Sequence, residues 1–294
     1  TPSTLFRDVT LFTPQGRRRG DCLVQQGRIA QLGGVQTEAD RTVRGEGRWL
    51  LPGAIDTHVH FRDPGFPHKE DFSTGSRAAV AGGVTTIFDM PNTTPATTDP
   101  RRLAEKRQRA ESSCRCNFGL FYGATTDNAS TYTDVDGVPG LKIFMGSSTG
   151  DLLVADRAAL EEVFAHWEGR ICVHAEDQQR LESRKQRYAD RSDPAVHSTI
   201  RDPQAAADAV RLACQLAIEY ERDLHILHLS TTDELAVLGK ARETVAQRGL
   251  DCRLTAEVCP HHLFLNTDIY DALGTRARVN PPIRSEKHRQ AVWE

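Results

Sequence analysis

Residues 51–60 read Leu-Pro-Gly-Ala-Ile-Asp-Thr-His-Val-His, an apolar run with two histidines at its end. The apolar run predicts a strand that ends at two histidines. Because residues i and i+2 of a strand face the same side, the imidazoles of His58 and His60 point in one direction. Two such imidazoles form half of a zinc-type site, although the short motif also occurs without metal. Barrel enzymes carry their sites at the carboxyl ends of strands, which favours the metal interpretation.

Short apolar runs alternate with helical segments along the rest of the chain. The predicted strands cover residues 51–60, 84–92, 117–123, 141–146, 171–175, 224–229 and 253–259. The predicted helices cover residues 72–81, 101–112, 156–167, 204–221 and 233–248, and a last one begins at 286. Apolar runs without alternation are typical of parallel strands buried on both faces. The repetition predicts an α/β fold, either a (β/α)8 TIM-like barrel or a doubly wound sheet. A barrel needs eight strands, and we find seven.

Residues 1–50 follow a different pattern. Short alternating runs at 6–12, 21–26 and 28–32, separated by turn residues, predict small antiparallel strands. A piece of this size has too little core to be stable alone. We therefore expect residues 1–50 to be part of a small β-sandwich domain, and residues 51–294 to form an incomplete barrel.

The composition excludes several classes of protein. Lys and Arg number 37 against 40 Asp and Glu, for a net charge of −3, which excludes a polybasic nucleic-acid binder. No apolar stretch reaches the roughly 18 residues of a membrane span. The seven cysteines form no CxxC pair, which indicates reduced thiols in the cytoplasm. We expect a small-molecule ligand, with neither nucleic acid nor membrane as a partner.

Lys142 is an anomaly within an apolar strand, in Gly-Leu-Lys-Ile-Phe-Met-Gly at 140–146. Burial of an ammonium is costly and lowers its pKa, so the amine becomes a nucleophile. If it captures carbon dioxide, the resulting carbamate is an anion with two oxygens that can bridge two metal ions. Taken alone, Lys142 is better explained as a lysine at a strand end whose ammonium reaches solvent.

Two further histidines end predicted strands, His174 after Ile-Cys-Val and His228 after Leu-His-Ile-Leu. With His58, His60 and Lys142 they occupy the ends of four different strands, which converge on one mouth in a barrel. This coincidence predicts a site for two metal ions. His225 should point away and be structural, and we interpret the His pair in Cys-Pro-His-His at 259–262 as shaping its loop, although it could add ligands.

Three polar residues near the same mouth are candidates for holding a substrate. Arg62 offers a planar fork that matches a carboxylate, Asn92 ends the second strand, and Asn280 lies in a rigid Asn-Pro-Pro loop. Each alone is equally explained as a surface arginine or a turn asparagine, and only their common location suggests a binding role.

The motifs together resemble the dihydroorotases of the amidohydrolase superfamily over nearly the whole chain. They are Asp-Thr-His-Val-His-Phe-Arg-Asp-Pro-Gly at 56–65, Asp-Met-Pro-Asn-Thr-Thr at 89–94, Leu-Lys-Ile-Phe-Met-Gly-Ser-Ser-Thr-Gly at 141–150, Val-His-Ala-Glu-Asp at 173–177, His-Leu-Ser-Thr at 228–231 and Glu-Val-Cys-Pro-His-His-Leu at 257–263. The resemblance implies a distorted (β/α)8 metal-dependent hydrolase barrel with two zinc ions. It implies that His58 and His60 hold one ion, that His174 and His228 hold the other, and that carboxylated Lys142 bridges them.

The same resemblance implies the activity. A metal-bridging hydroxide would open the cyclic amide of L-dihydroorotate to N-carbamoyl-L-aspartate, reversibly, in de novo pyrimidine biosynthesis. Two metal ions suit this reaction because they acidify water and polarise the carbonyl group. Arg62, Asn92 and Asn280 match family positions that bind the carboxylate and ring of the substrate. A homodimer is expected by analogy with the family.

One departure concerns the catalytic acid/base. The family carries it as an Asp in an Asp-His-Ala-Pro motif on the eighth strand, and we expect this Asp to lie beyond Glu294. The sequence therefore predicts an incomplete, inactive version of a longer enzyme, in which the first metal lacks one ligand. Two other interpretations remain open. The first is a dihydropyrimidinase (hydantoinase) or allantoinase of the same superfamily, and the second is a non-catalytic scaffold that has kept the barrel.

Overall fold

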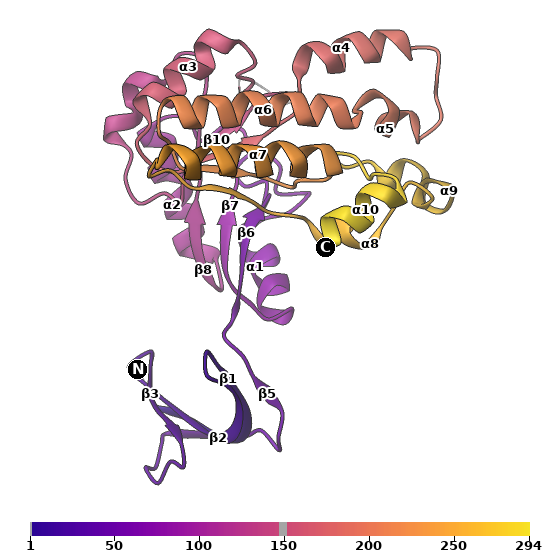
Figure 1. Cartoon of the computed structure of the whole chain (residues 1–294). Helices are drawn as coiled ribbons and strands as arrows, with labels where there is room; N and C mark the ends of the chain where they lie inside the picture. The colour runs from indigo at the N-terminus through magenta and orange to yellow at the C-terminus, as the bar shows by residue number, and fades with distance from the viewer. Residues whose placement is uncertain (1, 147–151) are drawn as a thin grey trace. The chain divides into compact units, whose positions relative to one another are not determined.

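A computed structural model describes residues 2–146 and 152–294 (Figure 1). The Ser-Ser-Thr-Gly part of the lysine motif, at 147–150, therefore lies outside the described residues. The chain divides into two compact units, Thr1–Ile55 with Gly83–Thr85, and Asp56–Gly82 with Thr86–Glu294. Each unit is described separately below.

The first unit is a β-structure. Strands β1 (Thr4–Thr13), β2 (Gly16–Gln25) and β3 (Arg28–Gly33) form an antiparallel meander, as predicted. Two short strands were missed, β4 (Arg41–Arg44) and β5 (Trp49–Leu50). Both pair with β1 in parallel, so the prediction of antiparallel strands alone is wrong for this sheet. Four and two residues are too short to display an alternating pattern. The buried core contains Leu5, Val9, Leu11, Cys22, Leu23 and Val35.

The remaining strands follow one another in sequence order. Strands β6 (Ala54–Val59), β7 (Val84–Asp89) and β8 (Asn117–Leu120) form one sheet. A second sheet contains β9 (Tyr122–Gly123), β10 (Leu141–Phe144), β11 (Ile171–His174), β12 (Leu224–Ile226) and β13 (Leu254–Ala256). The predicted strand at 117–123 is thus divided into β8 and β9, with only Phe121 between them. Each of the seven predicted runs contains strand residues.

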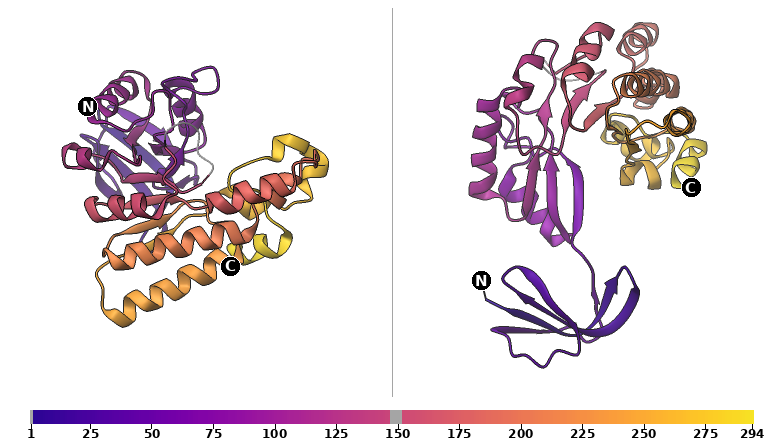
Figure 2. Two further views of the ribbon diagram at one scale, coloured as in Figure 1. Left: turned by 90° about the horizontal axis from the view of Figure 1, so that it is seen from above. Right: turned by 60° about the vertical axis from the view of Figure 1, so that its left-hand side comes forward.

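The α/β class is confirmed. Strands β7 and β8 pair in parallel, as do β9 to β13. The connecting helices include α1 (Phe72–Ala81), α2 (Pro100–Ser113), α3 (Arg157–His166), α6 (Pro203–Glu219) and α7 (Thr232–Arg248), close to the predicted ranges. Figure 2 shows these helices along the strands. In the part of the chain that is described, β6 and β8 are the edge strands of one sheet and β9 and β13 those of the other, so a closed eight-stranded barrel remains a prediction.

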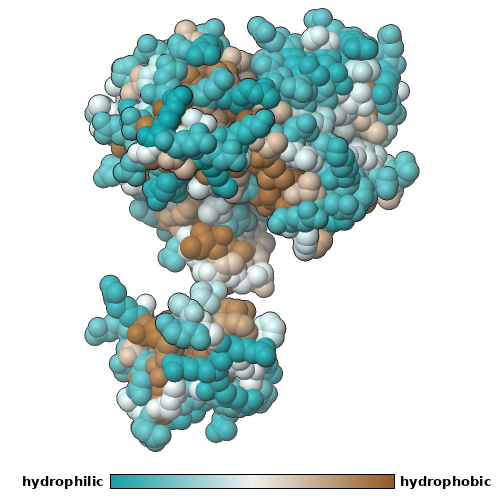
Figure 3. All heavy atoms as spheres, viewed as in Figure 1, coloured by the Kyte–Doolittle hydropathy of each residue, from teal (hydrophilic) through white to brown (hydrophobic). Residues whose placement is uncertain are grey.

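The expected burial of parallel strands on both faces is observed for some of the strands only. Every residue of β10 and β11 is buried, as the continuous apolar runs predict. Strand β6 is largely exposed, so the expectation of burial on both faces is wrong for it, because an outer strand is covered less completely. Figure 3 shows mainly hydrophilic side chains over the outer helices in this view. Among the described helices, none combines the length and apolar character needed to cross a membrane.

Several helices were missed because their sequences carry little apolar periodicity. They are α4 (Gln178–Arg187), α5 (Val196–Ile200), α8 (Pro260–Phe264) and α9 (Ile269–Leu273), besides the 3-10 turns η1 (Ala129–Asp134) and η2 (Gly274–Ala277). Helix α4 buries only Leu181. By contrast α10 (Glu286–Trp293) begins at the predicted residue. The predicted starts of α2, α6 and α7 carry side-chain caps from Asp99, Asp202 and Thr231.

Candidate metal centre

One pocket of about 600 Å³ in the second unit contains all of the residues singled out for a site. Its lining includes His58, His60, Arg62, Asn92, Lys142, His174, His228 and Asn280. They come from the carboxyl ends of β6, β7, β10, β11 and β12 and from the loop before α10. The pocket is also lined by residues that the sequence did not single out, among them Phe144, His197 and Arg278.

His58 and His60 form the first pair of nitrogen donors. Their Nε2 atoms lie 3.2 Å apart. The Nδ1 of His58 lies 2.5 Å from Glu257 Oε1, and the Nδ1 of His60 lies 2.7 Å from Asn92 Oδ1. Because both partners are acceptors, each Nδ1 carries the proton and donates it. Each Nε2 then has a free lone pair, and two lone pairs at this distance are suited to sharing a cation.

His174 and His228 form the second pair. His174 Nδ1 lies 3.0 Å from His228 Nε2, while His174 Nε2 donates to Glu176 Oε2 at 2.8 Å. Glu176 is fully buried and is also bonded by Arg201. His228 has a φ of 41°, in the left-handed region, a strained conformation that is found at functional sites. A carboxylate therefore orients the His174 ring, as carboxylates orient metal-binding histidines.

Burial keeps these imidazoles neutral. It lowers the pKa of His58, and the bond to Glu257 offsets this only partly. Burial also lowers the pKa of His60 and of His228 well below the usual value, and lowers the pKa of His174. A neutral imidazole is the form that binds metal.

Lys142 is fully buried on β10, as the sequence predicts. Its Nζ has no hydrogen-bond partner among the described residues and lies 4.4 Å from the centre of the Phe144 ring. Burial lowers the pKa of this amine to about 7. A large fraction of the lysine is therefore a neutral nucleophile near neutral pH.

Glu257 lies directly after β13, and its role beside His58 was not predicted from the sequence. Its carboxylate accepts hydrogen bonds from His58 Nδ1 and from Thr57 Oγ1 at 3.0 Å, and lies 3.3 Å from His225 Nε2. Burial would raise the pKa of Glu257, but the bonds from His225 and His58 outweigh it and hold the pKa well below its usual range. His225, predicted to be structural, does not line the pocket and supports this carboxylate. A glutamate immediately after an apolar strand is the signal that could have revealed it.

A buried ion pair between Asp89 and Lys106 stabilises the loop that follows His60. Asp89 Oδ1, at the end of β7, accepts the backbone N–H of Phe61 at 2.7 Å. Asp89 Oδ2 lies 2.7 Å from Lys106 Nζ of α2, which also donates to the Met90 carbonyl. Neither residue was singled out from the sequence, because each appears there as an ordinary charged residue.

Arg62 and Asn280 line the same pocket as the imidazoles. Arg62 has a φ of 57°, and its guanidinium makes no hydrogen bond or ion pair with the residues that the structure describes. Asn280 follows Val279, whose carbonyl is bonded by His197 Nε2 at 2.8 Å. The pocket therefore offers an available cation and an amide beside the metal-type donors.

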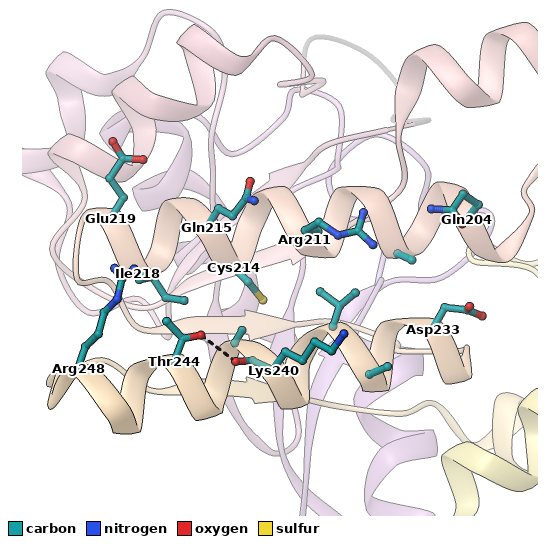
Figure 4. A pocket seen from close by; sticks show the side chains of 14 residues that line it. Gln204, Arg211, Cys214, Gln215, Ile218, Glu219, Asp233, Lys240, Thr244 and Arg248 are labelled. Atoms are coloured by element: carbon teal, nitrogen blue, oxygen red, sulfur yellow. Dashed lines mark hydrogen bonds between the residues drawn. The ribbon is translucent and has the colours of Figure 1, made fainter.

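A second hollow of about 690 Å³ lies between α6 and α7 and contains none of these residues (Figure 4). Charged and polar side chains such as Arg211, Gln215 and Lys240 border it. Cys214 points into it from α6. It lacks a cluster of metal-type donors, so the chemistry belongs to the pocket at the strand ends.

Parallel strands that bring histidines and a buried lysine to one pocket define an α/β protein of the metal-dependent hydrolase class. The amidohydrolase family matches residues 49–251, and the chain belongs to that family. Amidohydrolases are generally metal-dependent. The fold of the family implies a TIM-like barrel.

Individual relatives are similar over most of this chain. A dihydroorotase from Halobacterium salinarum is 39% identical over 255 residues, covering 83% of this chain and 56% of that protein. An allantoinase from Streptomyces avermitilis is 33% identical, covering 99% of this chain and 66% of that protein. The solved structure of an L-hydantoinase (dihydropyrimidinase) from Arthrobacter aurescens has a TM-score of 0.90 at 27% identity, covering 100% of this chain and 66% of that one. The chain thus spans between about half and two thirds of these relatives.

Proposed function

We propose that the protein is a zinc-dependent dihydroorotase, which interconverts L-dihydroorotate and N-carbamoyl-L-aspartate in de novo pyrimidine biosynthesis. The observation that carries the proposal is the arrangement of donors in the pocket. Two pairs of imidazole nitrogens, 3.2 Å and 3.0 Å apart, share the pocket with a buried lysine whose amine has no partner in the described chain. The similarity to dihydroorotases supports the choice of substrate.

The donor set fits two zinc ions. His58 and His60 would hold one ion, and His174 and His228 the other, because neutral imidazoles are preferred zinc ligands. The neutral Lys142 amine would attack carbon dioxide, forming an N–C bond and releasing the nitrogen proton to solvent, and the anionic carbamate would supply two further oxygen ligands in the pocket. Burial without a partner leaves the amine available for this reaction. When bound, zinc supplies an acidified water and polarises the amide carbonyl group.

The residues of the chain itself bind and orient the substrate. Arg62 would pair with the substrate carboxylate, because its guanidinium has no partner among the described residues and can form two parallel hydrogen bonds with a carboxylate. The Asn92 carbonyl oxygen is used by His60, so the Asn92 amide N–H groups remain to donate to the ligand. Asn280 would contact the ring from the facing loop.

Substrate binding by the zinc-loaded protein tests this proposal. We expect L-dihydroorotate to bind more tightly than allantoin or dihydrouracil, because it carries the carboxylate that Arg62 would bind. Arg62→Met should weaken the binding of dihydroorotate and leave bound zinc unchanged. Zinc binding without a preference for dihydroorotate would contradict the choice of substrate, and a protein that binds no zinc would favour a scaffold.

A hydantoinase or allantoinase is the second candidate, since both kinds of relative match nearly the whole chain. The Arg62 guanidinium, which is unpaired within the described part of the chain, favours a substrate with a carboxylate, which dihydrouracil and allantoin lack. Faster turnover of either compound, insensitive to Arg62→Met, would reverse the assignment.

The organisation expected from the sequence belongs to the same proposal. Residues 1–50 would belong to a small β-sandwich domain, and residues 51–294 would contribute to a closed barrel. The protein would form a homodimer. Sedimentation of the protein at several concentrations tests the dimer, and a monomer at all of them would contradict it.

A further inference from the structure

Three potential metal ligands lie together after β13, and none of them belongs to the two imidazole pairs. Cys259 precedes α8, and His261 and His262 lie in its first turn. The ligand atoms of the three residues all lie within 4.8 Å of one another. The His261 and His262 rings have centroids 4.3 Å apart. One sulfur and two nitrogens are a donor set that zinc-type ions prefer.

His262 is prepared to act as a ligand. Its side chain is buried, with only 2% of its surface exposed. Nε2 lies 3.2 Å from the Pro281 carbonyl oxygen, which can only accept, so the proton resides on Nε2. Nδ1 therefore carries a buried lone pair, and it has no partner among the described residues. A backbone carbonyl that fixes the tautomer in this way is typical of metal-binding histidines.

The other two donors are accessible to a cation. Cys259 and His261 line the pocket that contains the imidazole pairs. Cys259 occupies the N-cap position of α8 without a side-chain capping bond, so its sulfur is not engaged there. An ion on these three ligands would keep a fourth position open toward the pocket, as three-ligand zinc sites do.

We propose that Cys259, His261 and His262 bind one further zinc-type divalent cation in the wall of the pocket. The thiol loses its proton when the metal–sulfur bond forms, and the two imidazoles bind in their neutral forms. The site uses a thiolate, which neither imidazole pair contains. It is therefore independent of the proposed function and can be detected separately.

Cadmium titration of the protein tests the site, because cadmium bound to a thiolate gives an ultraviolet charge-transfer band. We expect the band to saturate at one thiolate site. Cys259→Ser should abolish it, and His262→Gln should weaken cadmium binding by roughly tenfold or more. Cys252→Ser and Cys114→Ser are matched controls that should leave the band unchanged. Far-ultraviolet circular dichroism checks that the variants fold.

A band that persists in Cys259→Ser would overturn the proposal. So would a band that disappears in Cys114→Ser, because Cys114 Sγ lies 3.8 Å from Cys116 Sγ and this pair could bind cadmium itself. If His262→Gln fails to fold, the Cys259→Ser result decides alone, since serine preserves the size of the side chain. The zinc that remains bound in Cys259→Ser reports on the imidazole pairs.

Discussion

Lys106 Nζ lies 2.7 Å from Asp89 Oδ2, and both side chains are almost completely buried. The pair ties α2 to the end of β7, and the second oxygen of Asp89 holds the backbone N–H of Phe61. Phe61 lies between His60 and Arg62, so an ion pair behind the pocket determines the path of the loop that carries a metal-type donor and the free guanidinium.

Removing one partner of this pair should destabilise the protein strongly. Lys106→Met leaves the Asp89 charge buried and uncompensated, and we expect a loss of about 3–5 kcal/mol in the free energy of unfolding. The double variant Asp89→Leu/Lys106→Met should lose less than the sum of the two single variants. Urea denaturation of the three variants measures this coupling, and additive losses would show that the pair is not a unit.

Lys142→Ala should reduce both bound zinc and activity. Among the described residues that line the pocket, the variant removes the one lysine amine that could form a carbamate, while the four imidazoles remain. We expect less zinc per chain than in the wild type, and partial recovery when a small carboxylate such as acetate is added, because it supplies two oxygens in the same space. Lys240→Ala, an exposed lysine on α7, is the matched control. Full zinc content in Lys142→Ala would disprove the bridging role.

Glu257→Gln should weaken zinc binding without removing a ligand. The carboxylate holds the His58 ring through a 2.5 Å bond, and losing its charge makes His58 a weaker donor. Loss of such a partner lowers metal affinity by roughly 10- to 100-fold. Competition with a chromogenic chelator measures the affinity. Glu219→Gln, an exposed position on α6, should behave like the wild type, and equal affinities in both variants would refute the expectation.

We expect Asp202 to contribute to the decrease in the free energy of unfolding at low pH. Burial raises the pKa of Asp202, but hydrogen bonds from Arg180 at 2.7 and 2.6 Å outweigh it and hold the pKa below its usual value. The stabilisation is therefore present above the unfolded-state pKa of about 3.9 and is lost as the pH falls through the folded-state value.

Asp202→Asn should lose about 1–2 kcal/mol near neutral pH and should be less sensitive to acid than the wild type. Asparagine still caps α6, so the difference reports the charge. Unfolding free energies between about pH 7 and about pH 2 measure it. The exposed pair of Arg191 and Asp193 offers Asp193→Asn as a control, with little expected change. A parallel acid profile in Asp202→Asn and the wild type would contradict this account.

The order of strands and helices and the main donors could be predicted from the sequence. The sequences of β10 and β11 are mostly apolar without alternation because both faces of these strands are buried. The spacing of His58 and His60 places both rings on one side of a strand whatever the rest of the fold is. Lys142 is conspicuous because a charged residue in such a run is costly.

What the sequence could not reveal depends on contacts between distant segments. Glu257 lies 199 residues from His58, and Asp89 pairs with a lysine on a helix, so no local pattern links them. Helix α4 has almost no apolar periodicity, and β4 and β5 are too short to show one. The proton positions on His60 and His262 were likewise set only by acceptors that folding brings beside them.

The sequence by itself therefore determined which side chains end the strands, because periodicity and hydrophobicity are local properties. The free nitrogen of His58, His60, His174 and His262, and the carboxylates that support His58 and His174, follow only from the folded structure. Those outcomes depend on hydrogen bonds and burial, which arise when segments far apart in the chain pack together.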